Sequence, residues 1–508
     1  MNNIDTPPHQ RHTERLVVAG SAVLLASIFG NGLNYLFGVF LARSLGADQF
    51  GLYALGITFF STLALVVPLG TDAGAVKFIS ERREHEDVHG TSKIIVQSVG
   101  VTFFASICVA LCLAGLSPII SETLYGKPDL KAVLLVFSAA IPLSAMTGVL
   151  LAALQAHQTV RPLIAVRYLW EPIAKFFLAG LMLWMGWGIG GVLGAIVLTL
   201  SVSLLLTIGF LRSVVPALFQ TRESWTFAGT SKLLTFCLPL AVAILFGVVT
   251  PRTDILMLGS WVRVHEIGIY QAAFQTASAL ALVLGALETS LTPYFGQLHA
   301  QQDMNGLKHM YQTASKLVMM CTVPLFVLLT VFSQEILSLF GPEFGAGGTL
   351  LVILAAGQML SSAGGSPNNL LLMGGHSRLV MWNTIGVGVL SIAVFAMTIP
   401  LWGVLGAAIG AASTQVLGVA LRVLQVWRLH HIQPFTQHLG KPILAGLATA
   451  VCALLAKSAV PAVFWPGLGC LIGVMYVGIL LALKLNAQDR QALEMLLTRV
   501  RALLAVRV

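Results

Sequence analysis

The segment FGLYALGITFFSTLALVVPLG, residues 50–70, runs for 21 residues without a charged side chain. About 20 apolar residues in a helix span the hydrocarbon core of a bilayer, and similar runs recur from Leu16 to Lys484. In lipid, each backbone group must find its hydrogen-bond partner within its own segment, so these long runs must be helices. The segment therefore indicates an all-α integral membrane protein that crosses the bilayer many times.

The composition of the whole chain supports this class. Hydrophobic residues make up 57% of the 508 residues and charged residues only 10%, with a mean hydropathy of +0.87. A soluble globule of this length needs more polar surface. Fourteen transmembrane helices are predicted. They lie near 16–42, 50–77, 94–117, 132–155, 163–185, 190–211, 233–260, 268–293, 317–334, 348–373, 380–400, 403–427, 442–460 and 466–484.

The distribution of basic residues predicts the orientation. With the N-terminus in the cytoplasm, 20 of the 29 Lys and Arg lie in inner loops, five lie outside and four lie within spans. Inner loops of membrane proteins carry such an excess, so both termini are expected to be cytoplasmic. The pI near 9.4 then reflects loops beside anionic lipid, and nucleic acid is not expected as a partner.

Sequence repeats predict an internal duplication. Gly51-Leu52-Tyr53 returns 217 residues later as Gly268-Ile269-Tyr270. Four more pairs follow in the same order: LLVFSAA with LLVILAA, LYG with LFG, Asp87 and Gly90 with Asp303 and Gly306, and GVLGA at 191–195 with GVLGA at 403–407. Six spans per copy is an even number, so the copies should be related by rotation about the membrane normal, with Tyr53 on Tyr270.

The duplication gives the expected domain organisation. Two six-helix lobes are followed by two additional helices and an amphipathic tail expected on the inner leaflet. The expected parts are the N-terminal tail 1–15, the N-lobe 16–211, the linker 212–232, the C-lobe 233–427, helices 13 and 14 within 442–484, and the tail 485–508.

Charged residues inside spans are the candidates for function. The stretch VVTPRTDILMLGS at 248–260 places Pro251, Arg252 and Asp254 in an apolar run, and Pro251 is expected to break the regular helix with a kink that lets water in. A charge at the bilayer centre costs about 2.5 to 3.5 kcal/mol, so such side chains should face water or a partner. Arg252 is interpreted either as an anion-binding residue or as part of an inter-helix ion pair. Asp254 is interpreted as an orienting or proton-accepting residue.

A second charged group lies in span 5. Arg167, Glu171 and Lys175 are spaced at i, i+4 and i+8, which predicts one stripe along a helix, with a kink at Pro172. The stripe is either self-neutralising or a basic ladder that attracts phosphate or an acidic sugar. Both interpretations remain open.

Other polar residues within spans are weaker candidates. Asp72 and Glu288 occupy matching places in the two copies and are candidates for ion coupling, although a solvated position at a helix end explains them as well. Asn31, Asn34 and Asn368, with its neighbour Asn369, are candidates either for binding sugar hydroxyls or for inter-helix hydrogen bonds.

Metal, nucleotide and cofactor sites are not predicted. The 12 histidines lie in loops or tails, the six cysteines form no CxxC pair, and there is no GxxxxGK[ST] phosphate loop. No outer loop much exceeds fifteen residues, which argues against an enzyme with a catalytic outer domain.

Three segments carry a family resemblance: LARSLGADQFGLYALGITFF at 41–60, DILMLGSWVRVHEIGIYQAAF at 254–274 and ILSLFGPEFGAGGTLLVILAAGQML at 336–360. They resemble the polysaccharide transporter branch of the multidrug/oligosaccharidyl-lipid/polysaccharide flippase superfamily, which includes the Wzx-type flippases. Essentially the whole chain is covered, but the shared motifs are loose Gly and apolar patterns.

The resemblance implies two six-helix lobes around a cationic cavity, in the bacterial inner membrane. It implies movement of an undecaprenyl-diphosphate-linked oligosaccharide to the periplasmic leaflet by alternating access, without a cofactor. Implied partners are this lipid-linked oligosaccharide, membrane lipid and other membrane proteins of polysaccharide assembly. A cation-coupled multidrug antiporter of the same superfamily is the alternative, and a purely structural membrane scaffold is a third.

Overall fold

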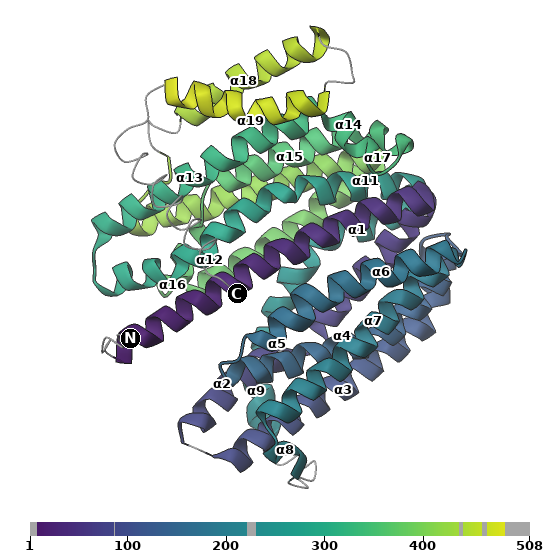
Figure 1. The fold of residues 1–508 in the computed structure, drawn as a ribbon, viewed down its shortest axis with the longest axis vertical. Helices are drawn as coiled ribbons and strands as arrows, with labels where there is room; N and C mark the ends of the chain where they lie inside the picture. Colours follow the sequence, from purple (N-terminus) through teal and green to yellow (C-terminus); the bar gives the residue numbers. More distant parts are fainter. Residues whose placement is uncertain (1–7, 86, 221–229, 436–439, 460–464, 483–508) are drawn as a thin grey trace, which may run out of the picture. The chain divides into compact units, whose positions relative to one another are not determined.

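In the computed structural model, residues 8–85, 87–220, 230–435, 440–459 and 465–482 are described (Figure 1). Every regular element in these ranges is helical, as predicted. The predicted amphipathic tail 485–508 lies outside the described residues, as do the first seven residues of the N-terminal tail and part of the linker.

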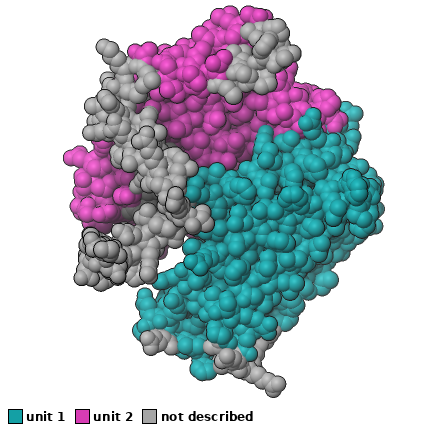
Figure 2. Space-filling view, viewed as in Figure 1, with its two compact units in different colours: residues 1–268 teal, residues 269–508 magenta. Residues whose placement is uncertain are grey.

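The chain divides into two compact units, residues 1–268 and 269–508 (Figure 2). The first unit contains α1 Pro8–Val66, α2 Thr71–Glu84, α3 Val88–Pro118, η1 Ile119–Leu124, α4 Leu130–Ala156, α5 Arg161–Leu163, η2 Ile164–Trp170, α6 Glu171–Trp184, α7 Gly188–Val214, α8 Ala217–Gln220, α9 Thr230–Val249, η3 Thr250–Arg252 and α10 Thr253–Trp261. It also contains the start of α11, Val264–Ala277.

The second unit continues through α11 and holds the remaining helices. These are α12 Ala279–Ala300, α13 Met304–Val331, α14 Ser333–Ser338, η4 Pro342–Gly347, α15 Gly348–Ala363, α16 Pro367–Met373, α17 Ser377–His430, α18 Gly440–Ala459 and α19 Trp465–Ala482. By packing, the first unit reaches beyond the predicted N-lobe 16–211, because α9 and α10 contact α1.

The predicted spans are largely helical where the structure describes them, but some are interrupted: the span 50–77 by a turn at 67–70 between α1 and α2, and the span 348–373 at 364–366 between α15 and α16. Among the described residues, nine helical stretches are each long and apolar enough to cross a membrane. This number is smaller than fourteen partly because α1 and α17 each hold two predicted spans. Single glycines with positive φ separate them, Gly46 (φ 74°) and Gly403 (φ 55°). A residue without a Cβ adopts this backbone without strain. The count of fourteen stays a prediction.

Apolar clusters hold each unit together. In the first unit, Ile79 of α2, Ile95 of α3, Leu150 of α4 and Leu211 of α7 form a buried cluster. In the second, one cluster joins α12, α13, α16 and α17. A further cluster packs α18 and α19 against α13, where both lie side by side in Figure 1.

Local geometry agrees with the sequence repeat. Asp87 and Asp303 precede α3 and α13 with nearly identical backbone angles (φ −80°, ψ 85° and φ −82°, ψ 81°). Their carboxylates accept hydrogen bonds from Gly90 N at 2.8 Å and Gly306 N at 2.9 Å. This cap satisfies an otherwise unpaired helix N–H in each copy.

One repeat pair needs a different register. Gly188 (φ 54°) and Gly403 (φ 55°) each follow a tryptophan and have nearly the same positive φ. They are 215 residues apart, which matches the other pairs better than the offset of 212 between the identical GVLGA strings. The backbone therefore pairs Gly188, rather than Gly191, with Gly403.

Candidate functional site

The predicted span 5 is irregular where its charges lie. Between α5 and α6, residues Ile164–Trp170 form the π-helix η2, in which the N–H of Glu171 donates to the carbonyl of Val166, five residues earlier. Pro172 follows at once and cannot donate the α-helical hydrogen bond to the carbonyl of Tyr168. Isolated π turns are frequent at functional sites.

Helix α1 approaches this irregular turn closely. A Cβ added to Gly30 would lie 2.8 Å from the carbonyl oxygen of Tyr168. Gly30 therefore permits a backbone contact that a side chain would block. One turn later on α1, the close approach brings Asn34 to α6.

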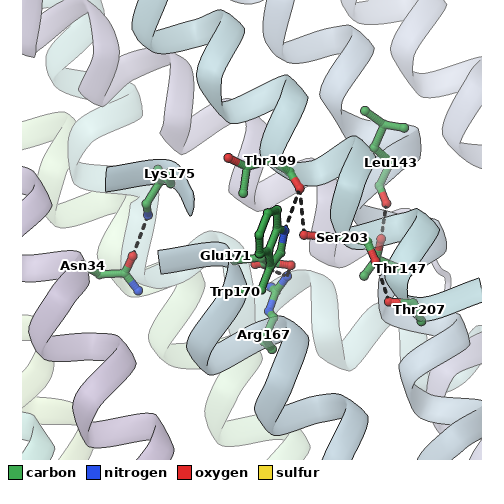
Figure 3. Close-up of polar contacts among 10 residues, drawn as sticks. All are labelled: Asn34, Leu143, Thr147, Arg167, Trp170, Glu171, Lys175, Thr199, Ser203 and Thr207. Carbon is green, nitrogen blue, oxygen red and sulfur yellow. Dashed lines mark hydrogen bonds and ion pairs between the residues drawn. The ribbon is translucent and has the colours of Figure 1, made fainter. Parts of the chain in front are cut away.

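The three charges of span 5 separate into two groups (Figure 3). Arg167 Nη1 lies 3.3 Å from Glu171 Oε2, and their side chains are 40% and 17% exposed. Lys175 instead donates a hydrogen bond to Asn34 Oδ1 at 2.5 Å, and its Nζ lies 4.7 Å from the ring centroid of Phe37. The predicted stripe is thus one ion pair and one lysine that contacts α1.

Hydroxyl groups on α7 lie beside this site. Trp170 Nε1 donates to the carbonyl of Thr199 at 3.4 Å, and Ser203 Oγ donates to the same carbonyl at 2.9 Å. Thr207 Oγ1 continues the series by donating to the carbonyl of Ser203 (Figure 3). These buried hydroxyls donate within their own helix, so they are not free donors, and it is the backbone carbonyl of Thr199 that holds Trp170.

The break predicted at Pro251 is present. Helix α9 ends at Val249, the 3-10 turn η3 follows, and α10 starts at Thr253. Asp254 is 2% exposed, and its Oδ1 accepts a hydrogen bond from Ile255 N at 2.7 Å. Arg252 is half-buried, and within the described part of the chain it forms no ion pair with an acidic side chain.

The remaining candidates of the first unit are scattered. Asp72 lies in the first turn of α2, and its Oδ1 is buried without a hydrogen-bond partner among the described residues. Asn31 is exposed on α1 and Asn34 is half-buried. Of these three residues, Asn34 contacts Lys175 (Figure 3).

In the second unit, two candidates lie close to one another. Glu288 of α12 is hydrogen-bonded to Ser366, which precedes α16 and is 2% exposed. Asn368 and Asn369 lie half-buried in the first turn of α16, two and three residues further on. The acid and the amide thus belong to one neighbourhood.

Arg422 is a candidate that the sequence analysis did not single out. It lies on α17, and its Nε is buried without a hydrogen-bond partner among the described residues. Gln415, two turns earlier, has a buried Oε1 in the same condition. The signal was present, because Arg422 is a charge inside a predicted span.

The first unit therefore combines cations with polar donors inside apolar helices. Arg167 is paired with Glu171, whereas Lys175 contacts the neutral Asn34 and Arg252 forms no ion pair with an acidic side chain among the described residues, so these two cations favour an anionic ligand. Among the described residues, no group of three or more His, Cys, Asp and Glu has the geometry to hold a metal ion. The arrangement suits binding of an anion and of hydroxyl groups.

Comparison with protein families gives two matches. The profile described as "Polysaccharide biosynthesis protein" matches residues 17–299, and the profile described as "MatE" matches residues 239–360. The first covers more than half of the 508 residues.

Two curated relatives are similar over part of their length. The "Probable low-salt glycan biosynthesis flippase Agl15" of Haloferax volcanii is 22% identical over 340 residues, 63% of this chain and 64% of the relative. The "Succinoglycan biosynthesis transport protein ExoT" of Rhizobium meliloti is 24% identical over 320 residues, 62% of this chain and 60% of the relative. The chain thus spans less than two thirds of these relatives.

Solved structures share the fold. The lipid II flippase MurJ, in an inward closed conformation, matches with a TM-score of 0.74 at 16% identity, over 90% of this chain and 97% of MurJ. An inward-facing multidrug resistance MATE family transporter matches with a TM-score of 0.66 at 14% identity, over 81% of this chain and 98% of the transporter. The fold is therefore that of multi-pass membrane transporters.

Proposed function

Because this chain belongs to the polysaccharide biosynthesis protein family, we propose that it is a membrane flippase for a polyprenyl-diphosphate-linked oligosaccharide. It moves the repeat unit of an O-antigen, capsule or exopolysaccharide from the cytoplasmic to the periplasmic leaflet by alternating access. The similarity to Agl15 and MurJ, which are named as flippases, and to the transport protein ExoT supports this class of activity.

The strongest support from the chain itself is Arg252. It is a half-buried guanidinium at a helix break, with no acidic partner among the described residues. A cation in this position is costly in lipid unless water or an anion solvates it. A diphosphate supplies that anion, and a planar guanidinium binds two phosphate oxygens at once.

The other polar residues are assigned roles from the chemistry of their side chains. Lys175 and Arg167 add positive charge for the diphosphate, while Asn31, Asn34 and Asn368 are assigned to the sugar hydroxyls. Asp254, Glu171, Glu288 and Asp72 are the candidates for ion coupling. The prenyl chain stays in lipid, because its transfer into a polar site would cost hydrophobic free energy.

Transport of this kind breaks no covalent bond, so the chain needs no catalytic residue. The proposed location is the bacterial inner membrane, with both termini in the cytoplasm. The positive-inside distribution of Lys and Arg supports this orientation.

Export of surface polysaccharide tests the proposal. Arg252→Ala should abolish export at unchanged protein abundance, and Arg252→Lys should restore only part of it, because one ammonium cannot make the bidentate contact. Arg263→Ala is the matched control, because the side chain of Arg263 is 88% exposed. That variant should export normally.

A packing role for Arg252 predicts a different pattern. If the residue only neutralised an acid on another helix, removing both charges together would rescue abundance and export alike. Such a rescue by a second substitution, for example at Asp254, would remove Arg252 from the binding site.

A cation-coupled multidrug antiporter is the second candidate, because the MatE profile matches residues 239–360 and a MATE transporter shares the fold. For an antiporter, a strain without the gene should become sensitive to cationic drugs while keeping its surface polysaccharide. Loss of polysaccharide without a change in drug sensitivity supports the flippase.

A further inference from the structure

An apolar groove opens between α3, α4 and α7 in the first unit. Its volume is about 580 Å³, and all of its lining residues are apolar. Val99 and Phe103 of α3, Leu150 of α4, Ile208 of α7 and Phe219 of α8 are among them. Part of its lining, Ile95, Leu150 and Leu211, belongs to the buried cluster of this unit.

Two basic side chains lie at one end of this groove. The guanidinium carbon of Arg212 is 5.1 Å from the ring centroid of Phe219, which lines the groove. Lys93 is exposed and precedes the lining residue Val96 by three positions, so it lies on the same face of α3. Within the described residues, neither cation forms an ion pair with an acidic side chain.

A second groove, between α4 and α7 alone, provides a comparison. It lies nearer the N-terminal ends of α4 and α7, has a volume of about 550 Å³, and is lined by Leu135, Ala139 and Leu198 among others. Lys131 precedes Leu135 by one turn, but its Nζ lies 3.5 Å from Glu122 Oε1. The cation beside this groove is thus neutralised, whereas those beside the first are not.

We propose that the groove between α3, α4 and α7 binds an acyl chain of an anionic phospholipid, whose head group contacts Arg212 and Lys93. In the proposed orientation this groove lies in the cytoplasmic leaflet, where anionic lipids attract basic side chains. An apolar groove of this volume gains dispersion contacts when an acyl chain fills it. The second groove should accept acyl chains without preference for the head group.

This inference is independent of the transported substrate. It names a lipid that remains bound at the surface of the first unit. The site also shares no residue with the group of Arg167, Lys175 and Arg252.

The test uses the full-length chain in nanodiscs that contain a phospholipid with a photoreactive acyl chain. The head group is phosphatidylglycerol in one preparation and phosphatidylcholine in the other, and mass spectrometry locates the crosslinks. Phosphatidylglycerol should label residues 99–104 more strongly than phosphatidylcholine. Each basic side chain should contribute about fivefold to this preference, which corresponds to about 1 kcal/mol.

Two variants sharpen the experiment. Arg212→Gln with Lys93→Gln should remove the preference at residues 99–104 while labelling by phosphatidylcholine continues. Ile208→Trp should fill the groove and reduce labelling by both lipids, with an unchanged thermal unfolding midpoint as evidence of folding. Labelling at residues 135–139 in the second groove should show no preference in any of these proteins.

Equal labelling of residues 99–104 by the two lipids would overturn the proposal, as would a preference that survives loss of both basic side chains. Displacement of phosphatidylglycerol by a prenyl phosphate at equal concentration would identify the groove as a site for the substrate tail, and would also overturn it.

Discussion

Gly51 lies directly against the backbone of Val264, so close that an added Cβ would overlap the carbonyl oxygen of Val264. Gly268, the repeat partner of Gly51, makes the reciprocal contact: it lies against the carbonyl of Ala47 on α1 in the same way. Each glycine thus meets the residue four positions before the other glycine. All four residues belong to the first unit.

This contact predicts a steric penalty. Gly51→Ala and Gly268→Ala should each destabilise the protein by about 1 to 3 kcal/mol, because backbone has to move to admit the methyl group. Gly148→Ala on α4 is the control, since a Cβ there meets nothing within 4 Å. Thermal unfolding in detergent measures the difference, and equal midpoints for Gly51→Ala and Gly148→Ala would disprove the close approach.

The orientation of the chain can be tested with reporter fusions. Fusions after residues 125 and 343 should report the periplasm, and fusions after residues 222 and 435 the cytoplasm. The reason is the excess of Lys and Arg in the loops assigned to the cytoplasm. A periplasmic signal after residue 222 would reverse the assignment.

The last two helices depend on a polar anchor within the second unit. Lys457 of α18 lies 2.6 Å from Glu335 Oε1, donates to the carbonyl of Val331 at 2.7 Å and stands 5.1 Å from the ring centroid of Phe332. Glu335→Gln should lower the free energy of local opening of α18 by about 1 to 3 kcal/mol, because Lys457 keeps its charge and loses its carboxylate partner.

Hydrogen exchange of the α18 amides measures that change. Faster exchange in Glu335→Gln, with no change in the exposed control Glu81→Gln, is the expected result. Unchanged protection of the α18 amides would show that apolar packing alone holds α18 and α19 against the rest of the second unit.

His157, in the loop after α4, predicts a pH dependence. Burial lowers the pKa of its imidazole and Arg83 lowers it further, while the hydrogen bond to the carbonyl of Ala153 at 2.9 Å acts in the opposite direction. A folded-state pKa below the unfolded one means that the unfolded chain binds the proton more tightly. This contribution to stability is therefore lost as the pH falls below about 6.5, the ordinary value.

The thermal unfolding midpoint should accordingly fall more between pH 8 and pH 5 in the natural protein than in His157→Gln. Glutamine can still donate to a carbonyl but does not titrate. Parallel curves for the two proteins would show that His157 titrates as it does in the unfolded chain.

Features that depend on one short segment of the chain were predictable from the sequence. The long apolar runs predicted the helices, Pro251 predicted an interruption of span 7, and the repeat of Asp87 and Gly90 at Asp303 and Gly306 marked two positions that share one local structure. Each of these depends on residues within a few positions of one another, where helix geometry and capping rules apply directly.

Features that depend on another helix were not predictable. The spacing of Arg167, Glu171 and Lys175 suggests one stripe, but the π turn before Glu171 and the contact with Asn34 divide it. The identical GVLGA strings suggested a register that the positive φ of Gly188 corrects by three residues. Arg422 is a charge inside a predicted span, but only the structure shows that its Nε is buried without a hydrogen-bond partner among the described residues.

The π turn at Ile164–Trp170 contains more residues per hydrogen-bonded ring than the α-helices on either side. The turn therefore takes up one extra residue that, in an uninterrupted α-helix, would turn the following side chains about 100° around the axis. Deleting one residue from it should restore α-helical bonding while α6 keeps its direction. Members of the family that differ by one residue here should therefore present Lys175 on the same side of α6, even though its spacing from the residues before the turn differs.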